Sequence, residues 1–254
     1  YNNGGMYKIY NSNLLFHGCM ILDNDGDFKD VPLGNKHFKG KELFDILDKY
    51  VRDAYFCKEN QYKDFCLDIM WFLWCGKNSP QFGKLKMSTF ERYFIEDESS
   101  YLEGKIPYYK YRNEESTADK ILNEFGLIPN SSHIINGHIP VKTKNGENPV
   151  KAGGKIIVID GGFCKAYQPK TGIAGYTLIY NSYGILLTSQ QPFVSTEIAI
   201  TEDKDMIFSS KIIKKSSKRI TVADTDIGKE LQEQINNLFK LVNLYYNNTI
   251  NEKF

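Results

Sequence analysis

Two short apolar segments, each followed by a glycine-containing turn, constrain this chain more than any other part of its sequence. Ile134–Ile135 leads into Asn136–His138, and the β-branched run Ile156–Ile159 leads into Asp160–Gly162. Short β-branched runs bounded by glycine are typical of buried strands. His138 and Asp160 would then follow strand ends, where loops held by a rigid sheet concentrate binding and catalytic groups.

A second histidine has the same kind of surroundings. Met6–Tyr10 and Leu14–Phe16 have the composition of two short strands, and His17 follows the second of them directly. Two histidines that follow strands of one sheet could meet at its edge, as His17 and His138 would. A histidine in a turn is, taken alone, more often a hydrogen-bonded surface group than a ligand. The two motifs by themselves leave both interpretations open.

The charge balance excludes one broad class of function. Of the 254 residues, 32 are Lys or Arg and 31 are Asp or Glu, so the formal net charge is +1. Binding to a nucleic-acid backbone needs a concentrated positive field, and we therefore expect no nucleic-acid partner. The run Lys211–Arg219 is basic, but we interpret it as a solvated turn at a sheet edge that discourages strand pairing.

The cysteines and the hydropathy pattern bear on the compartment. The chain has five cysteines and no Cys-x-x-Cys pair, which argues against a structural zinc site and favours reduced thiols in a cytoplasmic protein. No apolar run reaches the roughly 18 residues of a membrane span, so we expect no membrane partner. We also expect no signal peptide. Because the sequence opens on Tyr1 and not on Met, we expect that the natural protein starts further upstream.

Apolar periodicity predicts the remaining elements. Helices are expected where apolar residues recur at intervals of three and four, and strands where short β-branched runs lie between turns. Asp23–Asp27 does not match a calcium loop and predicts a solvated turn. The predicted helices are 39–59, 64–74, Ser116 or Thr117 to Phe125, and Asp224–Asn247; the predicted strand pairs are Tyr176–Tyr180 with Gly184–Thr188, and Met206–Ile213 with Arg219–Val222; Tyr101–Arg112 is expected to be irregular.

The segment 77–92 combines cations with glycines, small hydroxyls and aromatic rings. Such a mixture suits a phosphate ester, because Lys and Arg neutralise the phosphate while hydroxyls and amides orient it. By composition alone, a basic surface loop is an equally good interpretation. The candidate substrate-binding residues are Lys77, Asn78, Lys84 and Arg92.

Several long blocks of the chain together resemble class III fructose-1,6-bisphosphatases. The resemblance extends from about residue 6 to about residue 193 and is more specific than any single motif. That family is similar to the calcineurin-like metallophosphoesterases, so the resemblance implies a mixed α/β fold that forms part of a β-sandwich flanked by helices. The blocks that carry it are Asn13–Cys19, Leu73–Pro80, Thr89–Phe94, Asn136–Gly162 and Thr171–Ser182.

The resemblance also implies roles for single residues. In the larger group, two late histidines bind metal, and His17 and His138 match them, although Cys19 replaces the usual second glycine of the first motif. Asp160 and Asn136 would lie next to these ligands without binding metal. The cofactor would be a pair of divalent ions, Mn²⁺ above all, which can bridge a phosphate and activate water. We therefore expect the two imidazoles within about 7 Å of each other.

The group's other metal motifs do not occur here. The resemblance therefore implies the C-terminal portion of a longer enzyme, with no catalytic residue in this chain and a two-metal site completed by the missing N-terminal half. That enzyme would hydrolyse fructose 1,6-bisphosphate to fructose 6-phosphate and phosphate in gluconeogenesis, whereas this chain alone would be inactive.

Other interpretations stay open at this stage. One is a protein or dinucleotide phosphatase of the same group, and another is a non-catalytic half used for binding or oligomerisation. A homo-oligomer is expected in either case. We expect residues 1–193 to form the phosphatase portion, with a helical insertion at about 39–125, and residues 194–254 to form a hairpin and a long helix packed on it.

Overall fold

The computed structural model describes residues 1–58, 60–193, 195–203, 208–247 and 249–250. The chain divides into two units. The first contains Tyr1–Thr177 and Thr188–Ser210, and the second contains Leu178–Leu187 and Lys211–Phe254. The predicted boundary at residue 193 thus falls inside the first unit. The tip of the predicted hairpin 176–188 belongs instead with the C-terminal helix.

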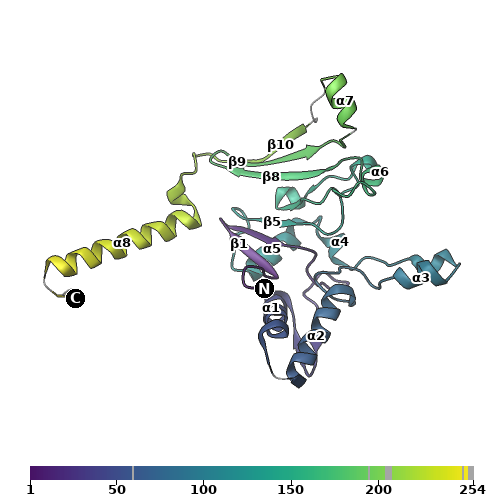
Figure 1. Ribbon diagram of the computed structural model, residues 1–254, viewed down its shortest axis with the longest axis horizontal. Coiled ribbons are helices and arrows are strands. Elements are labelled where there is room, and N and C mark those ends of the chain that lie inside the picture. Colours follow the sequence, from purple (N-terminus) through teal and green to yellow (C-terminus); the bar gives the residue numbers. More distant parts are fainter. Residues whose placement is uncertain (59, 194, 204–207, 248, 251–254) are drawn as a thin grey trace. The chain divides into compact units, whose positions relative to one another are not determined.

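A five-stranded mixed sheet forms the centre of the first unit (Figure 1). Its strand order is β1-β2-β5-β7-β6, with β1 antiparallel to β2, β2 and β7 both parallel to β5, and β6 antiparallel to β7. The mixed α/β class expected from the sequence is therefore confirmed. The strands are β1 (Tyr7–Tyr10), β2 (Asn13–Phe16), β5 (His133–Asn136), β7 (Ile156–Val158) and β6 (Val150–Lys151).

The central strands are buried, which accounts for their continuous apolar runs. All residues of β5 and β7 are buried, and Leu14, Ile134 and Ile156 are completely so. Parallel strands covered on both faces favour such runs over an alternating pattern. The β1–β2 hairpin turns through Asn11 and Ser12, whose φ angles of 47° and 60° match the left-handed positions of a tight type I′ turn.

Helices α1 and α2 pack against each other next to the sheet (Figure 1). Helix α1 (Gly40–Phe56) buries Leu43, Phe44 and Leu47, which recur at the spacing of one helical face. Both helices were predicted, although α2 begins earlier than expected and spans Asn60–Cys75. The final residue of the first predicted helix, 59, lies outside the described residues.

The predicted N-cap of the next long helix was wrong. Helix α5 spans Glu115–Glu124, with Glu114 at the N-cap and no capping hydrogen bond from its side chain. Thr117 is buried on the core side of the helix and so cannot cap it. The turn at Asp23 was predicted correctly, because its carboxylate accepts the backbone N–H groups of Asp25 and Asp27.

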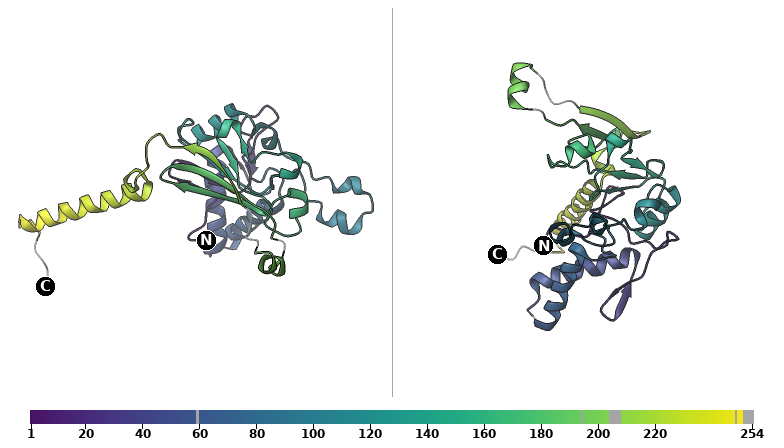
Figure 2. Two further views of the ribbon diagram at one scale, coloured as in Figure 1. Left: turned by 90° about the horizontal axis from the view of Figure 1, so that it is seen from above. Right: turned by 90° about the vertical axis from the view of Figure 1, so that its right-hand side faces the viewer.

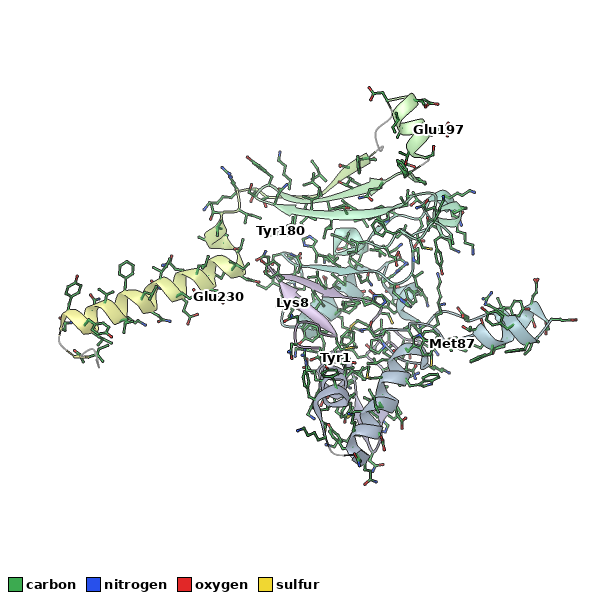
Figure 3. The ribbon with its side chains drawn as sticks, in the orientation of Figure 1. Tyr1, Lys8, Met87, Tyr180, Glu197 and Glu230 are labelled. Atoms are coloured by element: carbon green, nitrogen blue, oxygen red, sulfur yellow. The ribbon has the colours of Figure 1, made fainter. Side chains whose placement is uncertain are left out.

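A segment after α2 carries the short helix α3 (Thr89–Phe94) away from the sheet (Figure 1). Figure 3 places Met87 at the base of this segment. The region expected to be irregular contains a short helix, α4 (Tyr108–Tyr111). The other elements of the first unit not predicted from the sequence are β6, described above, β3 (Val31–Leu33), β4 (Lys36–Phe38), α6 (Gln168–Thr171), α7 (Thr196–Thr201), and the 3₁₀ helices η1 (Glu98–Tyr101), η2 (Thr143–Asn145) and η3 (Ala152–Gly154).

A further sheet has three strands in the order β10-β9-β8. The hairpin β8 (Gly175–Asn181) and β9 (Gly184–Gln190) was predicted, whereas the proposed pairing of Met206–Ile213 with Arg219–Val222 was wrong. β10 (Phe208–Lys215) instead lies beside β9. Residues 206 and 207 lie outside the described residues.

The basic run therefore begins in a strand and not in a turn, although that strand is an outer one, as expected of a solvated edge. Thr221 caps the 3₁₀ helix η4 (Val222–Asp224), so this stretch is unavailable for a strand. Helix α8 (Asp226–Tyr246) then follows as one continuous helix (Figure 2). None of the helices in the described part of the chain combines the length and apolar character that a membrane span needs.

Candidate functional site: two histidines at the ends of parallel strands

The parallel strands β2 and β5 bring two histidines together. His17 Nε2 lies 3.0 Å from His138 Nδ1, and the ring centroids are 4.9 Å apart. The Gly137 N–H donates to the carbonyl of His17 at 2.9 Å, which joins the two loops directly after the strands. The prediction that both imidazoles meet at one sheet edge is thus confirmed.

A backbone contact fixes the orientation of His138. Its φ angle of 68° is in the left-handed region, which is uncommon for a residue other than glycine. Its Nε2 donates to the carbonyl of Phe82 at 2.7 Å, because a carbonyl can only accept. In the neutral ring, Nδ1 therefore carries the free lone pair and faces His17. A ring nitrogen oriented in this way by a backbone carbonyl is typical of a metal-binding histidine.

The environment of His17 favours its neutral form. Burial, and then the neighbouring His138, lower the pKa of His17, while the carboxylate of Asp160 acts in the opposite direction. The neutral imidazole is the form that can bind a metal. In the arrangement described, His17 Nε2 donates to His138 Nδ1. Coordination would require the His17 proton to reside on its other ring nitrogen.

Asn136 supports the backbone beside His17. Its Nδ2 group donates to the carbonyl of Gly18 at 3.1 Å and to the hydroxyl of Tyr108 at 2.7 Å. Gly18 cannot carry a side chain, because a Cβ there would lie 2.2 Å from the carbonyl oxygen of Pro80. Asn136 thus holds a stretch that must approach its neighbours closely.

Asp160 and Cys19 have different surroundings. The Asp160 carboxylate accepts the N–H of Gly162 at 2.9 Å and orders the turn after β7. Cys19 is completely buried, and burial raises the pKa of its thiol. A buried neutral thiol is not a metal ligand, so Cys19 serves packing where the related motif has glycine.

Two of the four predicted substrate-binding residues are held by other groups of the chain. Lys84 forms an ion pair with Glu103. Arg92 donates to the Tyr101 carbonyl at 3.0 Å and to Ser88 Oγ at 3.3 Å. These contacts fasten the segment that carries α3, and they engage both cations within the chain.

The other two predicted residues are placed differently. Lys77 is exposed and makes no hydrogen bond or ion pair with the described residues. Asn78 has a φ angle of 69° and accepts a hydrogen bond from Lys29 Nζ at 3.1 Å. Of the four residues, only these two lie in the turn directly after α2.

Sequence reasoning missed the groups that position the site. The Phe82 carbonyl orients His138, but a backbone atom leaves no signal in the residue type. The Tyr108 hydroxyl reaches Asn136 from α4, in a region whose tyrosines gave no periodic pattern. Tyr108 is completely buried in the fold, and nothing in its local sequence predicted this burial.

A large open cavity reaches His17. Its volume is about 1060 Å³, and it runs along β1 and over Leu15, Ile135 and Ile159. Among the described residues there is no group of three or more His, Cys, Asp or Glu side chains that could hold a metal ion. The described part of the protein thus places two imidazoles beside an open hollow.

Two imidazoles at the ends of parallel strands, one oriented by a carbonyl, define a candidate half-site for a divalent metal. The model of the Firmicute fructose-1,6-bisphosphatase family matches residues 1–247, and the chain belongs to that family.

Curated relatives in clostridia are similar over the whole chain. A class 3 fructose-1,6-bisphosphatase of Clostridium novyi is 56% identical over 254 residues, and one of Clostridium tetani is 57% identical over 253 residues. The matches cover 100% and 99% of this chain respectively, but the chain spans only 38% of the length of either relative. No solved structure matches.

Proposed function

We propose that this chain is part of a metal-dependent phosphatase that hydrolyses fructose 1,6-bisphosphate to fructose 6-phosphate and phosphate, a step of gluconeogenesis. The pairing of His17 with His138 at 3.0 Å carries the proposal. Membership of the fructose-1,6-bisphosphatase family supports the choice of substrate over a phosphoprotein or a dinucleotide.

The donor geometry fits one shared divalent ion. With metal–nitrogen distances of about 2.0–2.1 Å, one ion could contact two ring nitrogens only if they lie within about 4 Å of each other. His17 Nε2 and His138 Nδ1 meet this condition, because they lie 3.0 Å apart. The Phe82 carbonyl already fixes the ring that would present Nδ1. Both residues would therefore bind the same ion.

We propose Mn²⁺ as that ion, in a two-metal site. Imidazole is a suitable ligand for manganese, iron or zinc, so the preference for Mn²⁺ rests on the resemblance noted in the sequence. When bound, paired divalent ions supply a nucleophilic hydroxide and neutralise charge on the phosphate. The part of this chain is to hold one ion through His17 and His138, while Asn136 and Asp160 keep the two loops in place.

The remaining ligands and the catalytic acid would come from the N-terminal half of the same enzyme. The curated relatives are much longer than this chain, which supports such a partner. The open cavity beside β1 would receive part of it, since Leu15 and Ile135 line the hollow with apolar surface. We therefore expect that the chain alone binds divalent metal weakly and hydrolyses nothing.

We assign the first contact with a substrate phosphate to Lys77 and Asn78. Lys77 has a cation that no described carboxylate neutralises, and the turn after α2 exposes it. Lys84 and Arg92 would act indirectly, by fastening the segment to Glu103 and Tyr101.

Two further expectations complete the proposal. We place the protein in the cytoplasm, which its five free cysteines support. We also expect a homo-oligomer. Helix α8 supports this, because only Gly228 of its 21 residues is buried, while apolar side chains such as Leu238 and Phe239 are exposed. The light-scattering mass with and without residues 224–247 tests the role of α8.

The activity itself is tested by complementation. Residues 1–254 are purified and assayed with Mn²⁺ for phosphate release from fructose 1,6-bisphosphate. They are assayed alone and after fusion to the remaining sequence of the Clostridium novyi relative. We expect no turnover from the chain alone and turnover from the fusion. Turnover by the chain alone would show that it holds a complete site, and an inactive but folded fusion would contradict the proposed activity.

A further inference from the structure

A second cavity opens beside helix α4, and its wall is basic and aromatic. The volume is about 630 Å³, within the usual range for a small-molecule site. Lys105 and Lys110 line it together with Tyr109 and Tyr111. Among the described residues that line the cavity, none is acidic.

Neither lysine of this wall forms an ion pair with a described carboxylate. Within the described part of the chain, Lys105 and Lys110 form no ion pair and no hydrogen bond through their ammonium groups. Lys105 Nζ lies 5.8 Å from the centroid of the Tyr109 ring, and Lys110 Nζ lies 4.7 Å from that of Tyr111. Both charges are thus held over rings at the cavity and not by carboxylates.

A third cation stands behind the same wall. The guanidinium of Arg112 lies 5.1 Å from the Tyr109 ring centroid, and its side chain is only 4% exposed. Its Nη2 group donates to Glu147 at 3.1 Å, but its Nε and Nη1 groups are buried and have no hydrogen-bond partner among the described residues. Buried polar groups are usually paired, so an arginine of this kind is exceptional.

The carboxylate that pairs with Arg112 is shared between two cations. Glu147 accepts from Lys151 at 3.1 Å as well as from Arg112. Both cationic side chains are nearly buried, at 4% and 8% exposure, so among the described residues one of the two positive charges has no counterion of its own. Such an excess is costly unless an anion offsets it. The excess of positive charge also affects Lys105. Burial, and then the charge of Arg112, lower the pKa of Lys105.

We propose that this cavity binds the phosphate group of a sugar phosphate, with Lys105 and Lys110 as the direct contacts and Arg112 supplying the positive field behind them. A phosphate monoester carries about −1.5 to −2 charges at neutral pH, which suits an uncompensated cluster of this sign. Lysine binds phosphate as a point charge without demanding one planar geometry. The tyrosine rings and Leu85 offer an apolar wall to the body of the ligand.

This site goes beyond the proposed function, since binding there requires neither a metal nor hydrolysis. The two proposals can therefore be tested apart. Binding is measured by isothermal titration calorimetry on residues 1–254 in the presence of EDTA, which prevents phosphate from binding through a metal at the histidines. The probes are fructose 1,6-bisphosphate, fructose 6-phosphate, inorganic phosphate and unphosphorylated fructose.

The variants remove charge without touching the core. Lys105→Met and Lys110→Met each remove one exposed cation at the cavity, and Lys36→Met removes an exposed cation on β4 as a matched control. Hydrogen bonds to charged groups predict a loss of about tenfold in affinity for each cavity lysine. The control should bind like the parent chain. Thermal melting of each variant checks that it is folded.

The four probes distinguish recognition of a sugar phosphate from recognition of free phosphate. We expect both sugar phosphates to bind more tightly than inorganic phosphate, and fructose not to bind. If inorganic phosphate binds as tightly as the sugar phosphates, the sugar body is not recognised and the assignment to sugar phosphates is overturned. Absence of saturable binding by any phosphate probe, or an equal loss in Lys36→Met, would overturn the site itself.

Discussion

The histidine loops and the segment 77–92 are both rich in chemically active side chains. The two regions differ in how those side chains are held in position. His17 and His138 follow neighbouring parallel strands, and the register of β2 with β5 brings their loops together. The cations of segment 77–92 lie in loops and in the short helix α3, and each of them has different local contacts. Buried strands thus determine the positions of the two histidines, whereas local contacts determine those of the cations in segment 77–92.

The largest expected effect concerns the histidine pair. In the fusion with the upstream sequence, His17→Ala or His138→Ala should lower phosphate release by at least about 100-fold, because even indirect supports of metal ligands are worth 10–100-fold. Metal content after gel filtration should fall in parallel. His37→Ala, which changes an exposed histidine on β4, is the matched control. If both site variants kept their activity and their metal content, the two histidines would not be metal ligands.

The second prediction tests the strands that support the histidines. Ile156→Ala removes a completely buried side chain from β7 and should lower the free energy of unfolding by about 2–5 kcal/mol. Ile212→Ala changes an isoleucine that is 63% exposed and should cost no more than about 0.5 kcal/mol. Urea unfolding of the purified chain measures both. Equal costs would mean that β7 is not part of a packed framework.

The third prediction separates two lysines of the basic segment. Lys77→Ala should raise the KM of the fusion for fructose 1,6-bisphosphate by about tenfold and leave the metal content unchanged, since it removes a charge contact with phosphate. Lys84→Ala should leave the KM within about twofold, because this ammonium group already pairs with Glu103. A larger change in KM for Lys84→Ala would show that Lys84 contacts the substrate directly. A loss of metal from Lys77→Ala would assign Lys77 to the metal site.

The smallest expected effect is a pH dependence of stability at the base of the α3 segment. Burial alone would raise the pKa of Glu103, but hydrogen bonds from Lys84 and from the Ser88 backbone outweigh it and lower the pKa. The stabilisation is therefore present above the ordinary carboxyl pKa of 4.5 and is lost as the pH falls through the lower folded value.

Urea midpoints between pH 3 and pH 7 measure this dependence. The parent chain should be more stable than Glu103→Gln at neutral pH, and the difference should shrink as the pH falls. A difference that stays constant with pH would show that the carboxylate contributes no pH-dependent stability. Glu98→Gln, on the exposed helix η1, serves as the control for loss of a charge in the same segment.

What could be predicted from the sequence follows the same division. Ile134 and Ile156 marked buried strands because apolar runs record burial directly, and the strands then placed His17 and His138. The partner of β10 was not recoverable, since edge strands such as Phe208–Lys215 pair through backbone groups that leave no trace in residue type. The ion pair of Lys84 with Glu103 joins two loops, and neither composition nor spacing records such a contact.

The central claim is that His17 and His138 bind one metal ion together. Its most direct test is a titration of residues 1–254, ¹⁵N-labelled at histidine, with Zn²⁺ as a diamagnetic substitute for Mn²⁺, followed by NMR of the imidazole nitrogens. The account predicts that the signals of His17 Nε2 and His138 Nδ1 shift to coordinated values along one shared binding curve, while those of His37 and His133 do not. Separate curves for His17 and His138, or coordination of only one of them, would contradict it.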